Sequence, residues 1–122
     1  MAIGELPVQP GSRAWMAGIM DSVFAECLKL REAGQKEYAH ADSNAFANFE
    51  RVAERLGLTR EQVLLVYAEK HFDGIHAWVK GHKSQREDVR GRINDMIVYL
   101  CLLRGMAEQN TQAAALMQER KA

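Results

Sequence analysis

The 122-residue chain has few of the residues that mark secreted or membrane proteins. Its two cysteines, Cys27 and Cys101, lie apart in apolar contexts and form no Cys-x-x-Cys pair, which predicts reduced thiols in a cytoplasmic protein. Only two prolines are present, and no apolar run approaches the roughly 20 residues that a membrane-spanning helix needs. We therefore expect neither a disulfide scaffold nor insertion into a membrane.

The chain also lacks net charge, because 16 Lys and Arg residues balance 16 Asp and Glu residues. Without a basic excess there is no field to attract nucleic acid or an anionic membrane, and the charge balance argues against a DNA-binding protein. The four histidines show no His-Glu-x-x-His or other zinc-ligand spacing. A glycine-rich phosphate loop and a nucleophile elbow are likewise missing, so zinc sites and nucleophilic catalysis find no support.

Apolar residues recur at steps of three and four along most of the chain, and this period predicts an all-α protein. The predicted helix ends are Gly34, Gly57 and Gly105, and the predicted capping boxes are Thr59 with Gln62 and Ser84 with Glu87. These signals divide the chain into a four- to five-helix bundle with a central antiparallel helix hairpin.

The expected segments are an extended arm over 1–11, a helical domain over 12–105, and a C-terminal helix or frayed tail over 106–122. Within the domain we expect helices over about 12–33, 44–56, 60–80 and 85–104, with a structured loop or a broken helix start between the first two. The second helix is expected to turn Phe49 and Leu56 inward, and the third, which is apolar over a wide arc, is expected to be the central helix.

The last of these predicted helices carries an unusual polar stripe. Asp88, Arg92, Asp95 and Tyr99 fall within about 60° of one another on a helix, and apolar residues flank the stripe on both sides. Buried charges must be paired and hydrogen-bonded, so the stripe needs partners on other helices or on a ligand. Two interpretations stay open: the stripe fixes the register of the helices, or it lines a ligand or metal pocket.

The preceding helix adds a pair of acids, Glu69 and Asp73, spaced four residues apart beside Lys70. Like charges at this spacing repel, so a cation is expected nearby. Carboxylates from two facing helices form an oxygen-rich site that suits Mg²⁺, and the antiparallel hairpin brings these acids toward Asp88 or Asp95. The alternative for Glu69 is a solvated ion pair. His71 of the same helix is predicted as a hydrogen-bonded core histidine, with a general base as the alternative.

A second candidate region is the polar stretch between the first two helices. It combines hydrogen-bond donors with an aromatic face near a helix N-terminus, a combination that suits an anion or a base. The alternative is an ordinary polar loop. The residues concerned are Lys36, Tyr38, His40, Asp42, Asn44 and Asn48.

Four stretches together resemble small phage and prophage proteins of the nucleotide-modification-associated type, which look like distant relatives of the MazG-like all-α nucleoside triphosphate pyrophosphohydrolases. The stretches are Lys36-Glu37-Tyr38-Ala39, 44–49, 69–75 and 92–100. The resemblance implies a helical bundle that binds a nucleotide with Mg²⁺, with Glu69, Asp73 and Asp95 standing for the metal-binding acids. Arg92 departs from the pattern, because it stands where a further acid is expected and offers a phosphate fork instead.

These observations lead to a functional hypothesis for a phage-derived protein of the host cytoplasm. We expect it to bind a nucleotide or a similar phosphate ligand as a homodimer, and to be a Mg²⁺-dependent or degenerate pyrophosphohydrolase. The alternative is a non-enzymatic phage protein that occludes a host enzyme or sequesters a signalling nucleotide. The predicted ligand-binding residues are Lys36, Tyr38, Asn48, Lys70, Arg92 and Tyr99, and the predicted metal ligands are Glu69, Asp73 and Asp95.

Overall fold

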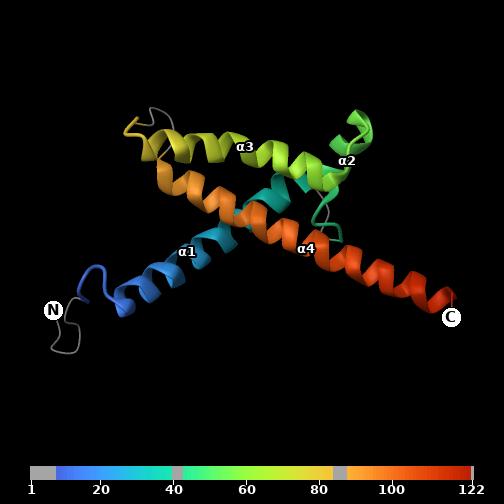
Figure 1. The fold of residues 1–122 in the computed structure, drawn as a ribbon, viewed down its shortest axis with the longest axis horizontal. Coiled ribbons are helices and arrows are strands. Elements are labelled where there is room, and N and C mark those ends of the chain that lie inside the picture. The colour runs from blue at the N-terminus through green and yellow to red at the C-terminus, as the bar shows by residue number, and fades with distance from the viewer. Residues whose placement is uncertain (1–7, 40–42, 84–87, 122) are drawn as a thin grey trace.

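The computed structural model describes residues 8–39, 43–83 and 88–121, and these are helical apart from short turns and caps. The elements are α1 (Arg13–Gly34), a π-helical turn η1 (Gln35–Ala39), α2 (Ala47–Leu56), α3 (Arg60–Val79) and α4 (Val89–Lys121). In Figure 1, α3 and α4 run side by side, and the C-terminal part of α1 crosses α4. The predicted all-α fold is therefore confirmed.

The predicted central hairpin is formed by α3 and α4. Arg60 near the start of α3 contacts Gln109, whereas His71 further along α3 contacts Asp95, so the two helices run antiparallel. The turn that follows α3 contains Gly81 at a φ of +95°, a conformation that favours glycine. No helix in the described ranges is both long enough and apolar enough to cross a membrane.

Local signals placed several helix ends correctly. Ser12 caps α1 by accepting the backbone N–H of Trp15, and Thr59 and Gln62 form the expected capping box of α3. Gly57 ends α2 in the left-handed conformation, at a φ of +67°. The other predicted capping box, Ser84 with Glu87, lies outside the described residues.

Two other glycines do not end helices as predicted. The chain continues past Gly34 into the π-helical turn, where a loop or a broken helix start was expected. It also continues past Gly105, so α4 runs on to Lys121 in place of a separate fifth helix or frayed tail. Gly105 is a glycine within the helix because of close packing: an added Cβ would lie 3.1 Å from the Phe46 ring.

The core lies where α2, α3 and α4 meet. Its buried residues are Phe49, Ala53, Val63, Leu64 and Met106. Leu56, expected to face inward, is exposed, and α3 also leaves much of its wide apolar arc open, including Trp78. The N-terminal half of α1 and the C-terminal half of α4 extend beyond the other helices in Figure 1, and their side chains are mostly exposed. Much apolar surface is thus left uncovered in one copy of the chain.

Arg60 connects the three core helices. Its guanidinium pairs with Glu50 of α2 at 3.0 Å and lies 5.0 Å from the centre of the Phe46 ring. It also donates to Gln109 at 2.7 Å and to Asn110 at 2.9 Å, both on α4. Asn110 in turn donates to Glu61, and this hydrogen bond is the main reason that the pKa of the Glu61 carboxyl is lowered.

Candidate functional site

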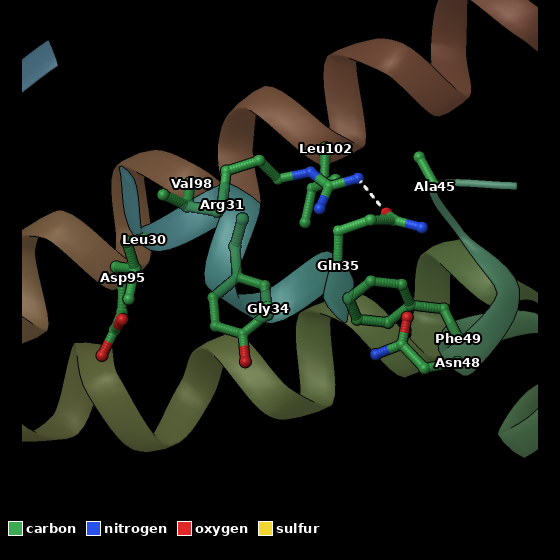
Figure 2. A pocket seen from close by; sticks show the side chains of 11 residues that line it. Leu30, Arg31, Gly34, Gln35, Ala45, Asn48, Phe49, Asp95, Val98 and Leu102 are labelled. Carbon is green, nitrogen blue, oxygen red and sulfur yellow. Dashed lines mark hydrogen bonds between the residues drawn. The ribbon is translucent and has the colours of Figure 1, made fainter. Parts of the chain in front are cut away.

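A pocket of about 140 Å³ lies between the C-terminal end of α1, the start of α2 and the middle of α4 (Figure 2). Its wall is mainly apolar, with Leu30 from α1, Phe49 from α2, and Val98 and Leu102 from α4 among the lining residues. Five of the lining residues have polar side chains: Arg31, Gln35, Asn48, Asp95 and Tyr99. An apolar pocket with a few converging polar groups is the usual form of a small-molecule site.

The π-helical turn sets the position of two of these polar groups. Arg31 donates through Nη2 to Oε1 of Gln35, as the dashed line in Figure 2 shows. Gln35 then donates through Nε2 to the backbone oxygen of Asn44 at 3.4 Å, which ties the end of α1 to the segment that leads into α2. Asn44 also accepts the backbone N–H of Phe46 at 3.0 Å, so it orders the approach to α2. These bonds hold the pocket's polar rim in place.

Asp95 is partly buried, as predicted, and its side chain is 22% exposed. Its Oδ2 lies 3.2 Å from Nδ1 of His71, a buried residue of α3. This is ion-pair distance, although Nδ1 lacks the alignment of a hydrogen bond. Asp95 therefore has its partner on another helix, and the predicted core histidine supplies it.

Tyr99 lies between two aromatic neighbours on different helices. Its ring centre is 6.3 Å from that of Phe49, with the rings nearly perpendicular, and 5.7 Å from that of His71. The ring also lines a second pocket of about 260 Å³, together with Tyr67, Lys70 and His71. Tyr99 thus separates the two pockets, and Lys70 belongs to the second one.

The polar stripe predicted on α4 divides in the structure. Asp95 and Tyr99 face the pocket, but Asp88 is exposed and pairs with Arg90 at 3.2 Å. Arg92 packs across Gly74 of α3, where an added Cβ would come within 2.6 Å of its side chain, and it reaches the backbone oxygen of Lys70 at 3.4 Å. The expectation of a buried row of four is wrong at its first member, because Asp88 precedes the first residue of α4 and is exposed.

The predicted metal ligands are not gathered into one site. Glu69 and Asp73 are exposed on α3, whereas Asp95 lines the pocket and contacts His71. Across the described ranges no three His, Cys, Asp or Glu side chains are grouped in a way that would hold a metal ion. Asp88, the other predicted partner of Glu69 and Asp73, is exposed at the start of α4. Among the described residues, Asp95 is thus the only predicted metal ligand that lines the pocket.

The polar stretch after α1 contributes less than predicted. Asn48 lines the pocket, but Lys36 is exposed and borders a separate depression with Lys29 and Glu32. Tyr38 belongs to the π-helical turn, and the description covers its backbone only. His40 and Asp42 fall outside the described residues.

Sequence reasoning missed Arg31 and Gln35. Both lie near the end of α1, four residues apart, and a helix brings residues at this spacing together. This spacing could have identified the pair, but the predicted helix ended at Gly34 and therefore left Gln35 outside it. Phe49 was predicted only as a core residue, and it is both buried in the core and part of the pocket wall.

Comparison with known proteins provides no further assignment. The chain matches no family model, no curated protein and no solved structure. The resemblance to MazG-like proteins accordingly remains a sequence-based hypothesis.

Proposed function

We propose that this protein binds a nucleoside phosphate in the pocket between α1, α2 and α4. The observation that carries the proposal is the convergence of Asn48, Asp95 and Tyr99, which come from two helices far apart in sequence and line one pocket with Arg31 and Gln35. Asn48 was predicted as a ligand-binding residue from the polar stretch after α1. Tyr99 and Asp95 were predicted from the polar stripe of α4, as a ligand-binding residue and a metal ligand.

The chemistry of the wall suits a nucleoside. The side-chain amide of Asn48 offers a donor and an acceptor, as the edge of a base requires, and the amide of Gln35 holds Arg31 in place beside it. Phe49 and Tyr99 present aromatic rings beside them, and Arg31 provides a guanidinium, the cation best shaped for phosphate oxygens. A volume of about 140 Å³ is smaller than the roughly 300–1,000 Å³ that encloses a whole ligand. We therefore place one ring of the ligand in the pocket and its phosphates at the mouth.

The proposal is limited to binding. Of the three predicted metal-binding acids, Asp95 of α4 lines the pocket, whereas Glu69 and Asp73 of α3 are exposed. These residues do not fit a metal site built within one chain. Phosphoanhydride hydrolysis with Mg²⁺, a phage origin and a cytoplasmic location stay predictions.

Calorimetric titration of the full chain with the common ribo- and deoxyribonucleoside triphosphates, with and without Mg²⁺, tests the proposal. At least one triphosphate is expected to bind, and Asn48→Ala and Arg31→Ala are each expected to weaken binding about tenfold, because each removes a hydrogen-bonding group. Gln112→Ala, on the exposed C-terminal half of α4, is the matched control and should leave the affinity unchanged. Absence of binding at millimolar nucleotide, or equal affinity in Asn48→Ala, contradicts the proposal. Release of pyrophosphate in the same samples would add a catalytic role.

A role in protein association is the second candidate, and the exposed apolar surface favours it. Large side chains that would ordinarily be covered are open along α1, α3 and α4, among them Phe24, Phe72 and Leu100. Patches of this kind mark interaction sites. We propose that a homodimer covers part of this surface, which is compatible with nucleotide binding and with a sequestering role alike.

A further inference from the structure

The uncovered surface of α1 has a defined shape. Met16, Met20, Phe24 and Leu28 follow one another at steps of four residues, and their exposed fractions range from 46% to 64%. Side chains at this spacing form a continuous ridge along a helix, and ridges of this kind pack into the grooves of a second helix. We call these four residues the α1 ridge.

An apolar groove of about 490 Å³ lies directly beside the α1 ridge. Phe24 and Leu28 form its α1 side, and Ile97, Val98, Cys101 and Leu102 form its α4 side. Arg31 is the one charged residue among those that line it. Cys27 also lines the groove, and burial is the main reason that the pKa of its thiol is raised, so it remains an uncharged thiol there. A ridge and a groove on the same face are the two halves of a self-complementary contact.

The chain exposes more surface area than a folded monomer of its mass. The accessible surface is 9702 Å², whereas a folded monomer of 13.8 kDa exposes about 6,600 Å². If the fifteen residues outside the described ranges are each given the roughly 160 Å² of an unfolded residue, and the other 107 are given the roughly 6,000 Å² of a folded monomer of that size, an excess of about 1,300 Å² is left. A stable dimer buries about 800 Å² or more on each partner. The excess thus matches what a second copy would bury.

We propose that two copies of this chain form a two-fold symmetric dimer in which the α1 ridge of each copy packs against the groove of the other. The two α1 helices run antiparallel, so that Met20 of one copy faces the partner's Phe24 and Met16 faces the partner's Leu28. Every contact then occurs twice, as a two-fold axis requires. The N-terminal half of α1, which projects away from the other helices in Figure 1, is covered by the partner.

The dimer also completes the candidate ligand site. Arg31, Ala45, Val98 and Leu102 line both the groove and the nucleotide pocket, so the two cavities share a wall. A partner helix in the groove fixes these side chains and shields that wall from water. This second part rests on the proposed nucleotide function, and association and ligand binding are then coupled.

Sedimentation of the full chain at several concentrations tests the association. The wild-type protein is expected to be a dimer, and Met20→Glu is expected to raise the dissociation constant at least 100-fold, because it places a charge in an apolar contact. Met117→Glu is the matched control, since it makes the same change at a similarly exposed methionine on α4, outside the ridge and the groove. A wild-type monomer at high concentration, or an unchanged dissociation constant in Met20→Glu, overturns the proposal.

A charge-pair experiment tests the antiparallel arrangement even where single variants fold poorly. Met20→Glu and Phe24→Lys chains should each associate weakly alone, because each buries an unpaired charge. When mixed, they should form a heterodimer, because the two new charges then face each other across the interface. Failure of the mixed chains to associate, while the wild type dimerises, overturns the antiparallel arrangement.

The effect on ligand binding is measured separately, with the same triphosphate titrations performed on Met20→Glu at concentrations where it is monomeric. We expect the affinity to fall about tenfold, within the usual range of coupling between sites. Unchanged affinity in the monomer overturns the coupling between association and ligand binding, whereas the dimer is still decided by sedimentation. If no triphosphate binds the wild type either, the nucleotide function fails while the sedimentation result still decides the dimer.

Discussion

At the scale of single residues, the contact between Asp95 and His71 joins the pocket wall on α4 to α3. Their closest atoms are 3.2 Å apart, and both side chains are largely removed from solvent. We predict that Asp95→Ala lowers the free energy of unfolding by about 1–2 kcal/mol, because it leaves a buried imidazole without its acidic partner. Urea denaturation measures the change. Asp73→Ala is the control, since Asp73 is exposed on the same hairpin and should change stability much less. Equal losses in the two variants would contradict the role assigned to this contact.

The same residues show how far side-chain positions can be predicted from sequence. Asp95 and Tyr99 are both partly buried, which the apolar neighbours on both sides of the stripe predicted in part. Glu69 and Asp73 share a helix with His71 but lie on its exposed side, and the sequence alone does not fix the rotation of α3 against α4. Arg92 was expected to meet phosphate, but it lies across Gly74, a close approach that depends on both helices.

At the scale of helices, Arg60 holds the core elements in register. It is 14% exposed and contacts side chains of both α2 and α4. We predict that Arg60→Ala lowers the free energy of unfolding by about 2 kcal/mol, through lost packing and lost charge-assisted hydrogen bonds. Arg60→Lys should cost about half as much, because an ammonium cannot reach acceptors on two helices at once in the way that a planar guanidinium does.

The control for Arg60 is another paired arginine. Arg104 lies 2.8 Å from Glu108, but its side chain is 79% exposed. Exposed ion pairs contribute little to stability, so Arg104→Ala should change the free energy of unfolding by less than about 0.5 kcal/mol. If the two alanine variants are equally stable, Arg60 does not connect the helices as described.

Helix existence was predictable from sequence, but helix ends were predictable only where the signal was local. The capping box at Thr59 and the left-handed Gly57 depend on neighbouring residues and were placed correctly. Gly105 gives the same local signal, yet it serves a contact with Phe46, a residue about 60 positions away. A glycine that ends a helix and one that admits a neighbour look alike in sequence, so α4 was predicted too short.

At the scale of the whole molecule, association is expected to contribute to the stability of the folded chain. The buried core of a single copy is small, and many large apolar side chains remain open until a partner covers them. For such a protein, stability includes the free energy of association and therefore depends on protein concentration.

Thermal unfolding over a range of concentrations measures this dependence. A tenfold increase in concentration adds about 1.4 kcal/mol to the stability of a dimer. For about 240 residues unfolding together, this should raise the Tm by roughly 3–5 °C. Met117→Glu should show the same slope as the wild type, because Met117 lies outside the ridge and the groove. Met20→Glu should unfold at a lower Tm that no longer varies with concentration. A wild-type Tm that stays constant across two decades of concentration would mean that each copy folds alone, and the exposed apolar faces would then need another partner.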